Sequence, residues 1–144
     1  MSNSSIAKAP LVAAVVALVG LVDAVYLTVH HLNGIGVQCS IVAGCEEVLN
    51  SSYAEIAGIP LAAFGALAYF TAFSLATLAA FGGGRSWTLF GVLVTLMSLF
   101  SLWLVYLQAF VINAFCQYCL LSAAVTFTLL TIYIVNRLLQ PKLK

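Results

Sequence analysis

Four long runs of apolar residues are the feature that most limits how this chain folds. A helix needs about 20 consecutive apolar residues to cross the hydrocarbon core of a bilayer. Hydrophobic residues make up 64% of the 144 residues, charged residues make up 6%, and the mean hydropathy is +1.15, unlike a soluble domain. Four stretches are long enough, at about Pro10–Leu32, Ile59–Phe81, Trp87–Ile112 and Gln117–Val135. The sequence therefore predicts an all-α fold, a polytopic membrane four-helix bundle that forms a single domain over residues 1–144.

The basic residues predict how this bundle is oriented. The connections expected at residues 33–58 and 113–116 contain no lysine or arginine, and the five basic residues all lie on the opposite side: Lys8, Arg85, Arg137, Lys142 and Lys144. Because basic loops stay inside, we expect both termini in the cytoplasm and all four cysteines on the extracytoplasmic face of the cell (inner) membrane. Basic residues this few and dispersed disfavour nucleic-acid binding. A cleaved signal peptide is disfavoured because the first apolar run is too long.

The long outer loop between the first two spans carries a short helical pattern. Within Cys45–Ile56, residues recur at spacings of three and four, namely Val48, Leu49, Ser52, Tyr53 and Ile56. The glutamates fall largely elsewhere around the axis. We therefore expect a short amphipathic helix that lies on the bilayer surface or caps the bundle. Gly58 and Pro60 are expected to end this helix and to begin the second span.

Two of the four cysteines form a C-x-x-C motif, Cys116-Gln117-Tyr118-Cys119, at the start of the fourth span. Residues three apart share one face of a helix, so the two sulfur atoms can approach each other. Unpaired N–H groups and the positive end of the helix dipole favour a thiolate at Cys116. Cys119 lies about one turn deeper, towards a lipid-soluble substrate. Two chance thiols or a structural disulfide are the alternative.

The other two cysteines, Cys39 and Cys45, lie in the long outer loop. A disulfide between them is either a structural link, worth roughly 2–3 kcal/mol, or a shuttle that exchanges with Cys116 and with an external protein. Two pairs on one face favour the shuttle. Four cysteines also suffice for a tetrahedral zinc site, but the spacing is unusual and an oxidising compartment disfavours free thiolates. We therefore expect no metal.

The order and spacing of these elements resemble the vitamin K epoxide reductase family in its bacterial and archaeal form. The matching segments cover the whole four-helix core: Cys39 and Cys45, then Val48-Leu49-Asn50-Ser51-Ser52-Tyr53, then Gly58-Ile59-Pro60-Leu61, then Cys116-Gln117-Tyr118-Cys119. The resemblance implies a four-helix bundle that encloses a quinone under a loop-borne cap helix. It also implies an activity that couples the thiols of a thioredoxin-like partner to quinone reduction.

The resemblance also assigns a role to each cysteine. Cys119 would lie beside the quinone, Cys116 would accept electrons from Cys45, and Cys39 would meet the external redox partner. Some bacterial relatives carry a fused thioredoxin-like domain, whereas this chain ends at Lys144. We therefore expect the partner to be a separate, DsbA-type extracytoplasmic protein.

Four further positions are candidates for the quinone site or its cap. Ser51 and Tyr53 resemble loop residues near the active site of the family. Animal members bind vitamin K with an asparagine near the start of the second span and a tyrosine one turn after the C-x-x-C motif. Here those positions are Leu61 and Ala123. This departure argues against vitamin K epoxide as the physiological substrate.

Asp23 is the one ionisable residue deep inside a predicted span. A charge near the bilayer centre costs at least about 2.5 kcal/mol on insertion scales, so such groups usually face the bundle interior or a cavity. Two roles remain open: a proton relay for a quinone, or a hydrogen bond to Tyr106, Ser98 or Ser101 on another span. The two histidines at the outer end of the same span are expected to be solvated.

The sequence thus predicts a quinone-linked thiol–disulfide oxidoreductase, with ubiquinone or menaquinone as a bound co-substrate. Electrons would pass from the external protein through two cysteine pairs to the quinone and so support disulfide bond formation. A DsbB-type protein also has four spans and two cysteine pairs, but in that family the C-x-x-C motif precedes the wider pair. The alternative from another class is a non-catalytic membrane protein with two structural disulfides.

Overall fold

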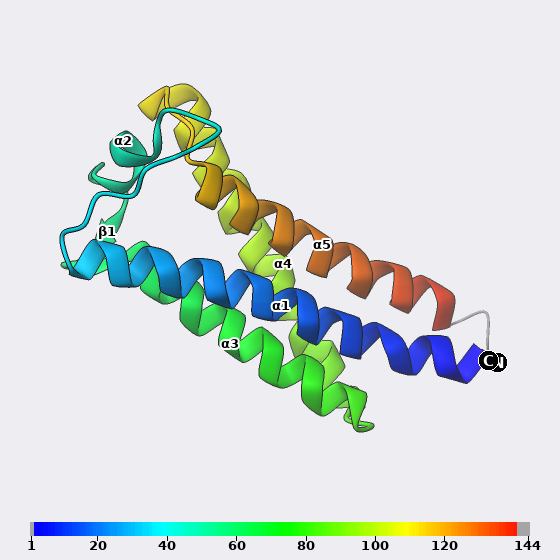
Figure 1. Cartoon of the computed structure of the whole chain (residues 1–144). Coiled ribbons are helices and arrows are strands. Elements are labelled where there is room, and N and C mark those ends of the chain that lie inside the picture. The colour runs from blue at the N-terminus through cyan, green and yellow to red at the C-terminus, as the bar shows by residue number, and fades with distance from the viewer. Residues whose placement is uncertain (1, 141–144) are drawn as a thin grey trace.

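Four long helices run through the computed structural model, which describes residues 2–140 (Figure 1). They are α1 (Ser2–Leu32), α3 (Leu61–Ala80), α4 (Gly84–Tyr106) with its π-helical continuation η1 (Leu107–Ile112), and α5 (Gln117–Leu139). Within the described residues, four segments are long and apolar enough to cross a membrane: Lys8–Leu32, Leu61–Ala80, Gly84–Ile112 and Gln117–Leu139. The predicted multi-pass helical bundle is confirmed, and α1 begins earlier than the expected first span.

The helix ends coincide with residues that interrupt a regular helix. After α3, Gly82 has a φ of 103°, a left-handed conformation that glycine adopts without strain, and α4 begins at Gly84. At the other end of the bundle, η1 stops where Asn113 has a φ of 56°. Only a few residues then lead into α5, so α4 and α5 pack as antiparallel neighbours.

The described basic residues share one end of the bundle. The start of α1, the α3–α4 turn and the end of α5 gather there (Figure 1), and these elements carry Lys8, Arg85 and Arg137. Lys142 and Lys144, the other two basic residues expected on the cytoplasmic side, lie outside the described residues. The segments that bear the cysteines lie at the opposite end.

The helical part of the cap is shorter than the sequence predicts. The helix expected over Cys45–Ile56 ends at Leu49, so α2 spans only Cys45–Leu49. Ser51 ends it, because its hydroxyl and its backbone N–H both donate to the Val48 carbonyl, at 2.7 Å and 3.3 Å. Serine offers the backbone such local alternatives to the helical hydrogen-bond pattern.

A small hairpin replaces the rest of the expected cap helix. Strands β1 (Glu55–Ile56) and β2 (Ile59–Pro60) pair antiparallel. The two residues between them, Ala57 and Gly58, have φ values of 54° and 81°, and positive φ at both positions is what a type I′ turn requires. The prediction that Tyr53 and Ile56 belong to one face of a helix is therefore wrong.

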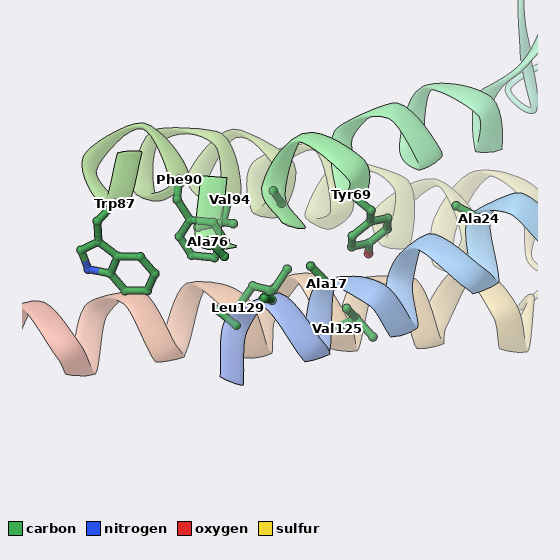
Figure 2. Packing of buried hydrophobic residues seen from close by; sticks show 12 residues of the cluster. Ala17, Ala24, Tyr69, Ala76, Trp87, Phe90, Val94, Val125 and Leu129 are labelled. Atoms are coloured by element: carbon green, nitrogen blue, oxygen red, sulfur yellow. The ribbon is translucent and has the colours of Figure 1, made fainter. Parts of the chain in front are cut away.

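Close packing around Tyr69 joins three of the long helices (Figure 2). A Cβ on Gly20 of α1 would overlap the Tyr69 ring, so the ring lies directly against the α1 backbone. The Tyr69 hydroxyl donates to the Ser122 carbonyl at 2.7 Å and lies 2.8 Å from the hydroxyls of Ser122 and Thr126 on α5. Small residues permit such contacts between membrane helices. Tyr69 therefore holds α3 against both α1 and α5.

Candidate functional site

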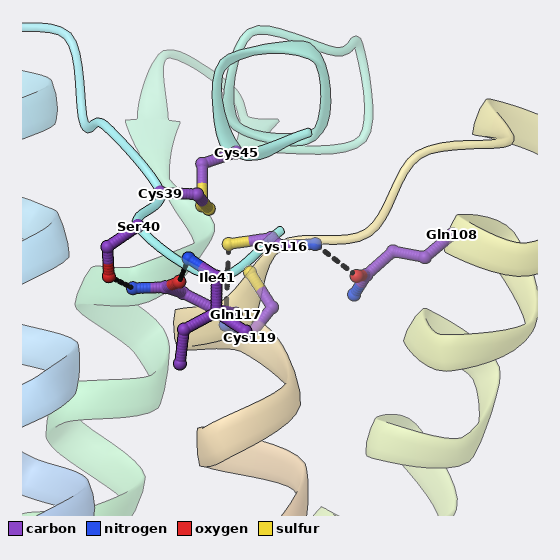
Figure 3. The surroundings of a disulfide bond; sticks show 8 residues. All are labelled: Cys39, Ser40, Ile41, Cys45, Gln108, Cys116, Gln117 and Cys119. Atoms are coloured by element: carbon purple, nitrogen blue, oxygen red, sulfur yellow. Dashed lines mark hydrogen bonds between the residues drawn. A yellow bond between two sulfur atoms is a disulfide. The ribbon is translucent and has the colours of Figure 1, made fainter. Parts of the chain in front are cut away.

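All four cysteines lie together at the loop-bearing end of the bundle (Figure 3). Cys39 and Cys45 form a disulfide with Cα atoms 5.6 Å apart, whereas Cys116 and Cys119 carry free thiols. Cys45 and Cys116 are 2% and 0% exposed and belong to one buried cluster, against which the other two cysteines pack. Within the described residues, no group of three or more His, Cys, Asp or Glu side chains is placed to hold a metal ion. The two pairs are neighbours, as thiol exchange between them requires.

Gln117 docks the cysteine-bearing loop onto the start of α5. Its Oε1 accepts a hydrogen bond from the Ile41 N–H at 2.9 Å, and its Nε2 donates to the Ser40 hydroxyl at 3.5 Å (Figure 3). Gln117 is the second residue of the C-x-x-C motif. The motif therefore carries its own contact to the segment that bears the second cysteine pair.

Gly44 brings Cys45 close to the residues just before α5. A Cβ at Gly44 would lie 2.6 Å from the carbonyl oxygen of Phe115 and 2.9 Å from its nitrogen. Only glycine, which lacks a Cβ, lets the two backbones approach this closely. Cys45 and Cys116, the residues that follow Gly44 and Phe115, are thereby held in the same cluster.

Cys116 occupies the N-cap position of α5, as the motif predicts. Its Sγ accepts a hydrogen bond from the Cys119 N–H at 3.4 Å, and its own N–H donates to Oε1 of the buried Gln108 at 3.0 Å. A hydrogen bond from the Cys119 thiol lowers the pKa of Cys116; burial opposes this effect, and the backbone N–H groups of Cys119 and Tyr118 add to it. The site thus favours a thiolate at Cys116.

A cavity of about 480 Å³ opens between the four long helices beneath the cap. Its volume lies within the range of small-molecule sites, and most of its lining is apolar. Cys119 is the cysteine that lines it. The other candidates named from the sequence line it as well: Asp23, Ser51, Tyr53, Leu61 and Ala123. The structure therefore brings all five of these positions together with the deeper sulfur of the C-x-x-C motif.

Sequence reasoning missed a set of polar residues in the cavity wall. Tyr69, Gln108, Ser122 and Thr126 all line the cavity. Ser122 and Thr126 follow Cys119 by three and seven residues, which places all three on one face of α5. That spacing could have predicted that Ser122 and Thr126 lie on the same side of the helix as Cys119. Gln108 was also detectable, as a lone amide within the third apolar stretch.

His31 joins α1 to the cap hairpin instead of standing solvated. Its Nε2 donates to Oε1 of Glu55 in β1 at 2.6 Å, and the two side chains are 22% and 48% exposed. A polar contact this accessible to water contributes at most about 1 kcal/mol. His31 also lines the cavity, so the expectation of a simply solvated histidine is corrected.

Asp23 faces the cavity without the hydrogen bonds that were considered for it. Its side chain is 7% exposed, and among the described residues its Oδ2 has no hydrogen-bond partner. Ser98 donates to the Val94 carbonyl of its own helix at 2.7 Å, and Tyr106 is 55% exposed. Ser101 lines the same cavity but does not bond to Asp23. The predicted interhelical hydrogen bond to Tyr106, Ser98 or Ser101 is therefore absent.

Comparison with known proteins relates the chain to one family and to a curated plant protein. The model of the vitamin K epoxide reductase family matches residues 11–134, a range that contains all four cysteines and every candidate residue of the cavity. The chain is also 32% identical over 118 residues to the thiol-disulfide oxidoreductase LTO1 of Arabidopsis thaliana. That alignment covers 76% of this chain and 31% of the plant protein, so the chain spans about a third of its relative's length.

Proposed function

The chain belongs to the vitamin K epoxide reductase family, and on this premise we propose that it is a thiol–disulfide oxidoreductase. Electrons pass from the thiols of an extracytoplasmic thioredoxin-like protein through two cysteine pairs to a membrane quinone. One observation carries the proposal: both pairs pack in one cluster, and Cys119, the deeper residue of the C-x-x-C motif, also lines the cavity.

The thiol steps transfer one electron pair through two disulfides. A thiolate of the external protein attacks Cys39, which is more accessible than the buried Cys45. Its second thiol then closes a disulfide within that protein and leaves the loop pair as two thiols. Cys45 attacks Cys116 of the oxidised Cys116–Cys119 pair and releases Cys119. Cys39 finally attacks Cys45, which restores the loop disulfide and releases Cys116.

The environment of Cys116 suits the last of these steps. Thiol exchange is faster when the departing thiol has a low pKa. The hydrogen bond from Cys119 lowers the pKa of Cys116, so Cys116 departs readily as a thiolate when Cys39 attacks. The result is a loop disulfide above a reduced C-x-x-C pair, which matches the arrangement in the structure.

The cavity is the proposed site of the second half-reaction. There Cys116 and Cys119 give up two electrons and become a disulfide, and the quinone takes these electrons with two protons. The apolar lining and the thiol in the wall fit an aromatic quinone ring, and Ser51 and Tyr53 are proposed to contact it from the cap. Leu61 offers no polar group to a substrate oxygen, so we propose ubiquinone or menaquinone rather than vitamin K epoxide.

The proposal includes an orientation in the membrane. Lys8, Arg85 and Arg137 share the end of the bundle opposite the cysteines, which supports cytoplasmic termini. A membrane-impermeant thiol reagent should then label reduced Cys39 in intact cells. Labelling that appears only after the membrane is opened would reverse the orientation and remove the extracytoplasmic partner from the scheme.

The decisive experiment compares two variants of the purified protein. Cys119→Ala should abolish the formation of quinol from ubiquinone or menaquinone analogues when a reduced thioredoxin-like protein is supplied. Ser98→Ala is the matched control, because Ser98 is buried but bonds only within its own helix and does not line the cavity. Quinol formation near the wild-type rate in Cys119→Ala would contradict the proposal. A wild-type protein that forms no quinol with either analogue would favour two structural disulfides.

A further inference from the structure

We propose that Asp23 is the proton donor for reduction of the quinone in the cavity; this inference rests on the function proposed above. Asp23 belongs to α1 and Cys119 to α5, and both line the same cavity. The Asp23 side chain is more than nine-tenths buried, and among the described residues its Oδ2 has no hydrogen-bond partner. One carboxyl oxygen is therefore free to bond to a ligand.

The proton balance of the reaction calls for such a group. Conversion of a quinone to a quinol takes two electrons and two protons. Cys119, whose thiol donates a hydrogen bond to Cys116, brings one proton. Cys116 leaves its exchange with Cys39 as a thiolate, which the Cys119 N–H at the start of α5 stabilises, and brings none. If the Asp23 carboxyl supplies the second proton, the products are a Cys116–Cys119 disulfide, a quinol and an Asp23 carboxylate. Electrons, protons and charge then balance.

The other titratable groups of the cavity are less suited to this role. His31 on α1 is paired with the cap hairpin, and Tyr69 on α3 is held by its hydrogen bonds to α5. Tyr53 belongs to the half-exposed cap segment, and Cys119 on α5 is already a reactant. The residues of α4 and η1 that line the cavity include no titratable group. Asp23 is thus the acid of this cavity lining that has, among the described residues, a carboxyl oxygen without a hydrogen-bond partner.

The surroundings of Asp23 fit a proton donor better than a structural residue. An apolar cavity accommodates a neutral carboxylic acid more readily than a carboxylate, and the neutral acid is the form that can donate. A purely structural carboxyl group would bond to a neighbouring helix, and this one does not. After each turnover, the carboxylate regains a proton from the outer end of the cavity. His31 lies there on the same helix, eight residues or about 12 Å away.

The test separates the proton step from the thiol steps. The variant Asp23→Asn keeps the side-chain shape but has no acid proton, and Ser98→Ala again serves as the buried control. Single-turnover quinol formation should slow by about 100-fold or more in Asp23→Asn, the usual scale of general acid catalysis. Exchange between the reduced thioredoxin-like protein and the two cysteine pairs should keep its wild-type rate. As the pH falls, the slow rate should rise steeply towards wild type, because solvent protons replace the missing donor.

A second variant guards against a structural explanation. Asp23→Ala leaves space for a small carboxylic acid, so added formic acid should restore much of its quinol formation. Wild-type rates and an unchanged pH profile in Asp23→Asn would overturn the proposal. Equal slowing of quinol formation and thiol exchange, with no recovery at low pH or with formic acid, would also overturn it. If the wild-type protein itself forms no quinol, it is the proposed function that fails.

Discussion

Replacing Gly44 with alanine tests whether the close contact between two backbones sets the rate of the proposed electron transfer between the cysteine pairs. The added Cβ would lie 2.6 Å from the Phe115 carbonyl oxygen, whereas ordinary contacts begin near 3.4 Å. The loop must therefore retreat by about 0.8 Å, and Cys45 moves with it because it is the next residue. A misplacement of this size between reacting groups costs on the order of 100-fold in rate. We expect exchange between the loop pair and the C-x-x-C pair to slow by up to that factor.

Rapid mixing with a reduced thioredoxin-like protein, followed by acid quenching and thiol labelling, measures this exchange. Gly84→Ala is the matched control, since a Cβ there meets no atom within 4 Å. A small dithiol that reduces Cys116–Cys119 directly should bypass the loop, so quinol formation in Gly44→Ala should then match the wild type. That result would show that the proposed quinone site is intact and that the defect lies in the contact between the pairs.

Two outcomes would refute the reasoning about Gly44. A folded Gly44→Ala protein that exchanges at the wild-type rate would mean that the contact with Phe115 does not position Cys45. Equal slowing with the external protein and with the small dithiol would mean that the variant damages the cavity end of the site instead. In either case the close backbone contact would have no specific role in the relay.

Two further predictions concern the relay and the packing of the bundle. In Cys39→Ser, Cys45 loses its loop partner and should be trapped in a disulfide with Cys116. Non-reducing peptide mapping should detect this disulfide. If it finds only Cys116–Cys119, with Cys45 free, two independent structural pairs are favoured. In Tyr69→Phe, the ring keeps its packing but loses its hydrogen bonds to α5. The free energy of unfolding should therefore fall by about 1–3 kcal/mol, as measured by denaturation in mixed micelles. An unchanged free energy of unfolding would show that these hydrogen bonds add nothing to stability.

The sequence predicted the long helices well and the cap poorly. Span length depends on runs of apolar residues, and the turns at Gly82 and Asn113 depend on local backbone preferences, so neighbouring residues suffice to predict them. The predicted cap helix is too long because its apolar residues recur at the three- and four-residue spacings of a helix. In the structure, the Ser51 hydroxyl donates a hydrogen bond to the Val48 carbonyl, and a type I′ turn follows at Ala57 and Gly58. Short segments of this kind are decided by competing local bonds that periodicity does not register.

The candidate site shows the same division between chemistry and geometry. The residue types and their spacing singled out the four cysteines and Asp23. The partners of Asp23 could not be predicted, because the rotation of α4 decides where Ser98 and Tyr106 point. Ser98 bonds within its own helix and Tyr106 is exposed, so the hydrogen bond that the sequence allowed does not form.

By itself, the sequence determined that this chain forms four apolar helices with two cysteine pairs at one end, because length, turns and residue order are properties of the chain. Only the tertiary structure decided which helix faces meet and what they enclose. The long helices carry large apolar residues at exposed as well as buried positions. Because lipid is as apolar as a leucine side chain, hydrophobicity alone selects no inner face. Shape selects the inner face instead, because Gly20 leaves room for the Tyr69 ring. In the cap, Gly44 likewise leaves room for the Phe115 backbone. Both are contacts between residues far apart in the chain.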